Sequence, residues 1–258
     1  MEEEVTAQGG TGTRRGDTIV TLRDRADAYA AAFPEYPASR PWVYVDEETD
    51  REALMAILVI GNNYRSEYVC ACPTGDPDQM RLFQQPDPEP LERCARCGLV
   101  MEPYYGQYPR GYMKRMMALF PDILATVDRE GVVEENHLHV FSGAMPAGNY
   151  ARLDINPMTG AERIGDVCKA ASLFEDRGPF GLIFADTPYS KPDAKRYGTT
   201  MIDRLKATSA LAAIASLGAF LVWLDVCWPM HRKSEWLTVG RIDIHRSTNH
   251  RIRLATLF

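Results

Sequence analysis

The chain has 258 residues, a formal net charge of −6 at pH 7 and 45% hydrophobic residues, which suits one sizeable domain with or without a small module. No apolar run approaches the roughly 20 residues that cross a bilayer, so we expect no membrane-spanning helix, and the start Met-Glu-Glu-Glu lacks the basic region and apolar core expected of a signal peptide. We therefore expect a cytoplasmic protein, and the acidic balance argues against strong indiscriminate binding to nucleic acid.

The first part of the chain predicts a short tail followed by a helical region. Residues 1–16 are rich in Glu, Gly and Thr, a composition typical of disorder. Residues 17–63 contain two predicted helices, Asp17 to Ala32 and Asp50 to Ile60, with a short strand from Trp42 to Val45 between them. Each helix would begin at an aspartate, a residue type that caps helix N-termini well.

Residues 64–105 differ in character, because they hold four of the six cysteines in two closely spaced pairs. Cys94 and Cys97 have the CxxC spacing of a zinc knuckle. Cys70 and Cys72 form a tighter pair that can still offer two thiolates to the same ion. The segment resembles a zinc ribbon, and we expect one structural Zn²⁺ here, since four thiolates leave no open position. Unrelated thiols or a redox pair are the alternative.

The segment after the cysteines combines a tyrosine-rich stretch with an amphipathic pattern. Tyr104 to Tyr112 carries four tyrosines, two glycines and a proline. Such a stretch could stack nucleic-acid bases or pack as a loop, and we favour packing. Gly111 to Leu124 then predicts a helix whose methionines and Phe120 face the core.

From Asn136 onward strands alternate with helices, which predicts an α/β domain over residues 106–258. The predicted strands are short apolar runs at Leu138–Phe141, Ala151–Ile155, Ile164–Val167, Leu182–Ala185 and Ala219–Asp225. A helix is expected over Thr199–Leu217, and an antiparallel hairpin over Leu237–His245 and Arg251–Phe258. Only eight residues, Ser142 to Asn149, separate the first two strands, whereas a parallel crossover usually contains a helix.

Acidic residues lie at the ends of three of these predicted strands. They are Asp154, Asp166 and Asp186, and ligands of open α/β sheets bind just beyond the carboxyl ends of the strands. Asp186 is followed by a stiff turn that directs a carboxylate, backbone carbonyls and an aromatic ring into one crevice. Taken singly, each acid could equally be a surface or turn-capping residue.

Two motifs carry a resemblance to a known family. The stretch Asp186-Thr187-Pro188-Tyr189, after an apolar strand and before a polar loop, resembles the Asp-Pro-Pro-Tyr motif of the S-adenosylmethionine-dependent methyltransferases that act on exocyclic amines of adenine or cytosine. Phe141-Ser142-Gly143 resembles the Phe-x-Gly motif that opens the cofactor site in that family. Thr187 replaces the family's usual proline, and the second glycine of its Phe-x-Gly-x-Gly pattern is absent.

The resemblance covers roughly Asn136 to Phe258, about half the chain. It implies a Rossmann-like class I methyltransferase sheet that closes with the C-terminal antiparallel hairpin. It also implies that Phe141, Ser142 and Gly143 contact S-adenosylmethionine, with Asp154 at the ribose hydroxyls and Asp166 at the adenine ring.

For catalysis, the resemblance implies that Asp186 and the backbone carbonyl of Thr187 accept hydrogen bonds from the target amine. Pro188 would stiffen the turn, and Tyr189 would stack on a base that has left its duplex. The implied substrate is DNA, with RNA as the alternative nucleic acid.

A basic loop follows the last predicted parallel strand. His231, Arg232 and Lys233 could contact phosphates, or could be an ordinary solvated loop.

Two other functions remain open. The short connection and Thr187 favour a catalytically inactive methyltransferase-like module that binds nucleic acid or protein. The acidic net charge favours a methyltransferase of small molecules or proteins.

Overall fold

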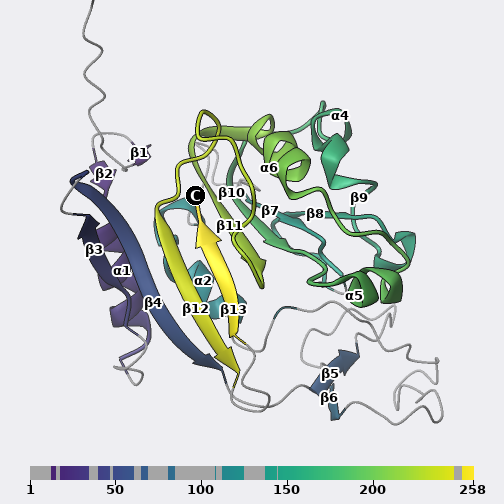
Figure 1. Cartoon of the computed structure of the whole chain (residues 1–258), viewed down its shortest axis with the longest axis horizontal. Helices are drawn as coiled ribbons and strands as arrows, with labels where there is room; N and C mark the ends of the chain where they lie inside the picture. Colours follow the sequence, from purple (N-terminus) through teal and green to yellow (C-terminus); the bar gives the residue numbers. More distant parts are fainter. Residues whose placement is uncertain are drawn as a thin grey trace, which may run out of the picture.

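The computed structural model describes residues 13–15, 18–34, 40–46, 49–60, 65–68, 81–84, 108, 112–124, 137–143, 145–246 and 252–258. These residues form a mixed α/β fold around a nine-stranded sheet (Figure 1). In spatial order its strands are β3 (Trp42–Asp46), β4 (Arg51–Ile60), β12 (Gly240–Arg246), β13 (Ile252–Leu257), β11 (Ala215–Asp225), β10 (Phe180–Asp186), β7 (His137–Val140), β8 (Ala151–Asp154) and β9 (Arg163–Ile164).

The sheet has a parallel half and a mixed half. β9, β8, β7, β10 and β11 are parallel neighbours. β13 runs antiparallel to both β11 and β12, β12 is parallel to β4, and β3 is antiparallel to β4. The chain first builds β7, β8 and β9 in one direction and then returns to place β10 on the other side of β7. The carboxyl ends of all five parallel strands therefore meet at one edge.

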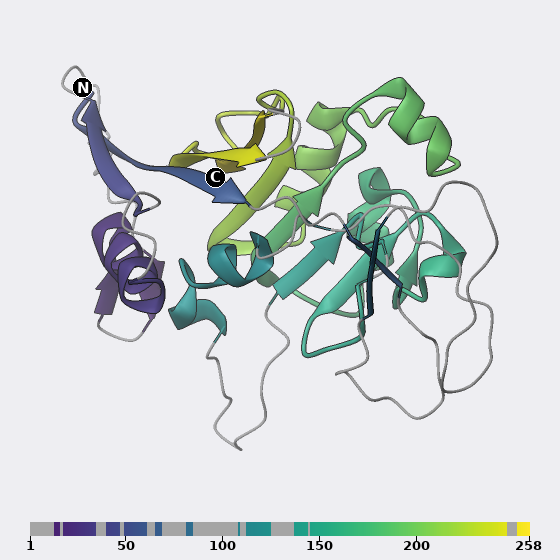
Figure 2. The ribbon, with the colours of Figure 1, turned by 90° about the horizontal axis from the view of Figure 1, so that it is seen from below.

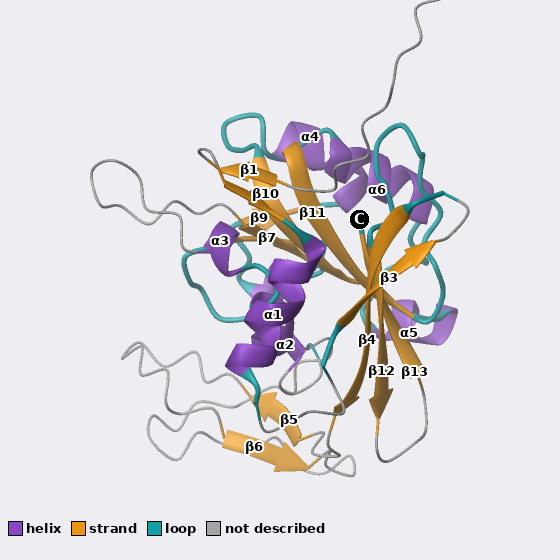
Figure 3. Cartoon of the chain, turned by 90° about the vertical axis from the view of Figure 1, so that its left-hand side faces the viewer, coloured by secondary structure: helices purple, strands orange, loops and turns teal. Residues whose placement is uncertain are grey.

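Helices cover both faces of the sheet (Figures 2 and 3). On one face, Leu182 and Phe184 of β10 pack with α1 (Leu22–Ala32), α2 (Tyr112–Met117) and α3 (Pro121–Leu124). On the other face, Ile183 and Ala185 pack with α4 (Ala170–Leu173) and α6 (Arg204–Ala212). Because strand side chains alternate between faces, a strand covered on both sides is apolar throughout. The run Leu182–Ala185 therefore correctly predicted a central strand.

Short helices complete the connections of the parallel half. They are η3 (Pro157–Thr159), η4 (Val167–Lys169) and α5 (Lys191–Arg196). α6 begins later than predicted, because the carboxylate of Asp203 caps it by accepting from the Lys206 amide at 3.1 Å. It also ends earlier, since β11 already starts at Ala215. Gly218, the expected helix stop, lies within β11 at φ 77°, where the pairing with β10 is irregular.

The N-terminal helix has a capping box. The Thr21 hydroxyl accepts from the Asp24 amide at 3.2 Å, and the Asp24 carboxylate accepts from the Thr21 amide at 2.8 Å. Two orphan amides at the start of α1 are thereby satisfied. The predicted cap, Asp17, lies outside the described residues, and the short strand β2 (Thr18–Val20) precedes the helix.

The predicted helix from Asp50 to Ile60 is wrong, because Arg51–Ile60 forms strand β4. Its sequence is rich in good helix formers, but local propensity is a weak prior that tertiary pairing overrides. Leu54, Ala56 and Leu58 alternate into the core, and β3 and β12 satisfy the backbone on both edges. The described part of residues 17–63 thus contains one of the two predicted helices, and β3 and β4 extend the main sheet.

Two further predicted segments differ in part. β1 (Thr13–Arg15) falls within the tail predicted as disordered and pairs with β2, so that prediction is wrong for these three residues. The predicted helix Gly111–Leu124 is divided by a turn before Pro121 into α2 and α3. The expected strands at Trp42, Ala151 and Ala219 and the C-terminal hairpin are confirmed.

Within residues 64–105, the structure describes β5 (Arg65–Tyr68) and β6 (Arg81–Gln84), which form an antiparallel pair. The four cysteines predicted to bind zinc, Cys70, Cys72, Cys94 and Cys97, lie outside the described residues. Among the residues that are described, no three or more His, Cys, Asp or Glu side chains are grouped so that they could hold a metal ion. None of the described helices has the length and apolar character that crossing a membrane requires.

Candidate active site

The structure brings the residues predicted to contact the cofactor and the target amine to one edge of the sheet. Asp166, Asp154, the Phe141–Gly143 turn and Asp186 follow or end β9, β8, β7 and β10, which are adjacent parallel strands. The winding direction of the chain reverses between β7 and β10. In open α/β sheets such a reversal leaves room for a ligand at the carboxyl ends of the strands.

The turn after β7 has unusual backbone geometry. Phe141 has φ 58° and Gly143 has φ 53°, and a bulky residue in the left-handed region is strained by about 1–3 kcal/mol. The Gly143 amide donates to Asp154 Oδ2 at 2.8 Å, and the Met145 amide donates to the Ser142 carbonyl at 3.1 Å. These bonds hold the tight turn in place.

The connection from β7 to β8 is as short as the sequence indicated. Ten residues, 141–150, join the two strands, which nonetheless pair in parallel. The described part of this connection contains no helix. The buried guanidinium of Arg152 donates to the Met145 carbonyl at 2.5 Å and so fixes the connection against β8.

The two acids predicted at the cofactor are already engaged with the backbone. Asp154 Oδ1 accepts from the Asn156 amide at 2.8 Å, while Oδ2 accepts from Gly143. Burial raises the pKa of Asp154, and these backbone hydrogen bonds act in the opposite direction. Each carboxylate oxygen has a second lone pair, so Asp154 can still accept a ribose hydroxyl. Asp166 is exposed and caps η4 by accepting from the Cys168 amide at 2.9 Å.

Asp186, at the end of β10, is a carboxylate in a low-dielectric setting. Burial raises its pKa to about 6, and the nearby carboxylate of Asp225 adds to the rise. The positive charge of Arg253 and a hydrogen bond from the Tyr189 hydroxyl to Asp186 Oδ1 act against it. The group is therefore ionised at neutral pH, with lone pairs left for another donor.

Tyr189 links Asp186 to a basic residue of β13. The guanidinium of Arg253 lies over the Tyr189 ring, 4.3 Å from its centroid, in a cation–π arrangement. One face of the ring is thus covered by Arg253 while the hydroxyl faces Asp186. The predicted stacking on a base would have to use the opposite face.

Buried aromatic side chains lie near Asp186 or on the strands that lead to it. Burial raises the pKa values of Tyr108 and Tyr112, and the charge of Asp186 adds to both shifts. His139 stacks on Phe184 with ring centroids 5.0 Å apart, and burial lowers its pKa to about 3, so it is neutral. Tyr112 is fully buried, which confirms packing rather than base stacking for this tyrosine.

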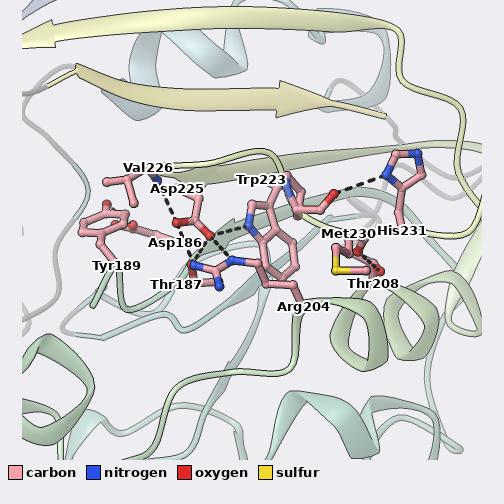
Figure 4. A network of polar contacts seen from close by, with 11 residues as sticks. Asp186, Thr187, Tyr189, Arg204, Thr208, Trp223, Asp225, Val226, Met230 and His231 are labelled. Carbon is pink, nitrogen blue, oxygen red and sulfur yellow. Dashed lines mark hydrogen bonds and ion pairs between the residues drawn. The ribbon is translucent and has the colours of Figure 1, made fainter. Parts of the chain in front are cut away.

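The sequence interpretation missed a second carboxylate, the buried Asp225, which accepts a hydrogen bond from Thr187 of the motif (Figure 4). Asp225 Oδ2 accepts from Arg204 Nε at 2.7 Å, the Thr187 hydroxyl at 3.1 Å and Trp223 Nε1 at 3.2 Å. Asp225 Oδ1 accepts from the Val226 amide at 2.7 Å. The available signal was its position at the end of an apolar strand, the same signal that identified Asp186.

The structure does not bring the predicted phosphate contacts to this site. Figure 4 shows His231 well apart from Asp186, beyond Trp223. Arg232 pairs with Glu235 at 3.1 Å, and Lys233 is exposed. These features are those of an ordinary loop, and a role in phosphate binding stays a prediction.

The site thus combines a carboxylate with a pKa of about 6, an adjacent backbone carbonyl and an aromatic ring. They lie at the reversal point of the parallel strands. The carboxylate and the carbonyl can accept hydrogen bonds from an amine, and the carboxylate can also receive a proton. The chain matches no known family model, and no curated protein or solved structure is detectably similar to it. Its function is therefore inferred from these residues and their geometry.

Proposed function

We propose that this chain is an S-adenosylmethionine-dependent methyltransferase that acts on an exocyclic amine of a DNA base. The observation that carries the proposal is the order β9-β8-β7-β10-β11. Numbered along the chain, this is 3-2-1-4-5, the order of doubly wound dinucleotide-binding sheets. Together with the antiparallel β12–β13 hairpin beside β11, it supports a Rossmann-like class I methyltransferase sheet. The two resembling motifs flank its reversal point.

The turn after β7 fits a bound nucleoside cofactor. Ser142 is buried, and its hydroxyl has no hydrogen-bond partner in the described structure, as expected of a group that awaits a ligand. Phe141, Ser142 and Gly143 would contact S-adenosylmethionine, and Asp154 and Asp166 would hold its ribose and adenine. The bound cofactor would supply an electrophilic methyl group.

The motif residues would act on the amine. The nitrogen lone pair of an exocyclic base amine is delocalised into the ring, which makes it a poor nucleophile. Hydrogen bonds from this amine to the Asp186 carboxylate and the Thr187 carbonyl would localise the lone pair and orient it. With a pKa near 6, Asp186 could also receive the proton that the amine releases.

The rate of methyl transfer should depend on the ionisation of Asp186. Because the carboxyl must be ionised to accept from the amine, kcat/KM should be low below pH 6 and rise to a plateau above it. Arg253 lowers the pKa of Asp186, so Arg253→Gln should move the midpoint to higher pH. His139 cannot cause this rise, since its pKa is about 3. A flat profile between pH 5 and 8 would contradict the assignment.

The direct test of the proposal has two parts. Calorimetry with S-adenosylmethionine should show one saturable site per chain. Transfer of labelled methyl should then be measured with duplex DNA, single-stranded DNA and RNA as separate substrates. No heat of binding at millimolar cofactor would overturn the proposal. Label found in RNA alone would mean that the substrate is RNA and not DNA.

A specific observation favours the alternative of a non-catalytic module. Both oxygens of Asp154 already accept backbone amides, and the β7–β8 connection lacks a crossover helix in its described part. Such a module would bind nucleic acid or a protein without incorporating label. The net charge of −6 suits a methyltransferase of small molecules or proteins, which the labelled assay would also detect.

The zinc prediction from the sequence remains part of the proposal. Cys70, Cys72, Cys94 and Cys97 should bind one Zn²⁺ through four thiolates. Purified protein should therefore contain one equivalent of zinc by metal analysis, and Cys94→Ser should lose it. Cys227, which is exposed and outside this set, offers a matched control, since Cys227→Ser should retain the metal. Wild-type protein without zinc would refute the site.

A further inference from the structure

Thr187, which stands where the Asp-Pro-Pro-Tyr pattern has a proline, makes a buried side-chain hydrogen bond. Thr187 is only 2% exposed, so its hydroxyl cannot turn to solvent. The hydroxyl donates to Asp225 Oδ2 at 3.1 Å. Thr187 and Asp186 are consecutive and make their contacts with different groups, Thr187 with Asp225 and Asp186 with Tyr189.

The acceptor of this hydrogen bond is itself firmly held. Asp225 is the last residue of β11. The residue before it, Leu224, pairs with Asp186 of β10 in parallel register. Arg204 of α6 reaches both carboxylate oxygens, with Nε at 2.7 Å from Oδ2 and Nη2 at 3.1 Å from Oδ1. This two-point pairing fixes the carboxylate in orientation as well as in position. Trp223 and Val226 add further donors.

We propose that Asp225 and Arg204 are positioning residues, which hold the Thr187 carbonyl in place through the Thr187 hydroxyl. The inference rests on the proposed methyl transfer, in which that carbonyl accepts a hydrogen bond from the target amine. A proline at this position would restrict the backbone through its ring. In this chain, a side-chain hydrogen bond to the buried carboxylate of the Arg204–Asp225 ion pair supplies the restraint.

The contacts of Asp225 allow the position of the Thr187 carbonyl to be tested without a large loss of fold stability. If the Thr187 hydroxyl is removed, Asp225 keeps its bonds from Arg204, Trp223 and Val226, so no buried charge is left unpaired. Thr187→Val, which has nearly the same shape, should therefore fold normally. The carbonyl would lose its restraint, and a misplacement of about 1 Å in such a site can lower the rate by about 100-fold.

The experiment compares wild type, Thr187→Val and Thr187→Ser in steady-state methyl transfer to DNA, with thermal unfolding measured in parallel. Thr187→Val should lower kcat by about 10- to 100-fold with little change in KM or in cofactor affinity. Thr187→Ser, which keeps the hydroxyl, should recover most of that loss. Arg204→Lys, which keeps the charge but loses the two-point pairing, should lower kcat with Thr187 intact.

Two outcomes would overturn the inference while leaving methyl transfer established. One is a Thr187→Val enzyme with the kcat of wild type, and the other is a Thr187→Ser enzyme as slow as Thr187→Val. If Thr187→Val does not fold, Thr187→Ala provides the same comparison. A wild-type protein that transfers no methyl group would instead overturn the proposed function, and this inference with it.

Discussion

Replacing Asp186 with alanine should nearly abolish methyl transfer while leaving the fold and the affinity for S-adenosylmethionine nearly unchanged. The carboxylate would act chiefly in the transition state, when the amine nitrogen gains positive charge, so its loss should appear in kcat. Removal of one such electrostatic contact typically lowers kcat by about 10²–10³-fold. Labelled methyl transfer under saturating cofactor measures the effect directly.

Stability data should accompany this comparison, and their sign is fixed by the pKa. Burial in the folded protein raises the pKa of Asp186 to about 6 from its ordinary value of 3.8. The folded state therefore loses stability relative to the unfolded state as the pH rises between these values. Asp186→Ala removes that penalty. The variant should therefore lose less stability than wild type between pH 4 and pH 7.

A matched control for the activity comparison is Asp176→Ala. The Asp176 side chain is 68% exposed and pairs with Arg163 on the surface, so its loss should leave methyl transfer as in wild type. If Asp186→Ala labels DNA as well as wild type does, Asp186 only caps a turn.

The second large effect concerns stability. Asp225→Ala should lower the free energy of unfolding by about 3–5 kcal/mol, because breaking a buried ion pair leaves its partner uncompensated. Asp225 is fully buried, and its loss would remove the acceptor of the Arg204 guanidinium and of the Trp223 indole N–H. Arg204 is 20% exposed, so partial hydration places the expected value toward the lower end. Denaturant unfolding at constant m-value measures it.

Asp243→Ala is the matched control for this prediction. The Asp243 carboxylate also accepts from an arginine at 2.7 Å, but its side chain is 25% exposed and that of Arg241 is 40% exposed. Such a pair contributes at most about 1 kcal/mol. Equal losses in the two variants would mean that the Asp225 network does not stabilise the fold.

The sequence predicted the parallel half of the sheet better than the rest of the fold. Leu182–Ala185 and Phe220–Leu224 are buried on both faces, so uninterrupted apolar runs identified their strands. Asp186 was found because an acid at the end of such a run is conspicuous. Parallel pairing then brought the ends of β7 and β10 together, as the strand–helix alternation indicated.

What the sequence could not predict depends on contacts between distant segments. Arg51–Ile60 is a strand because β3 and β12 pair with its two edges, and β12 lies far along the chain. Arg204 and Arg253 reach Asp225 and Tyr189 from separate elements, and no local pattern marks either arginine as part of the site. The same holds for the Thr187 hydroxyl, whose partner becomes visible only when β10 and β11 lie side by side.

The most direct measurement of the central claim is mass spectrometry of nucleosides from DNA that has been incubated with the protein and S-adenosylmethionine. The proposed function predicts a nucleoside methylated on an exocyclic amine, of adenine or cytosine, formed by wild type and formed about 10²–10³-fold more slowly by Asp186→Ala. DNA that remains unmethylated, although the protein binds the cofactor, would contradict it.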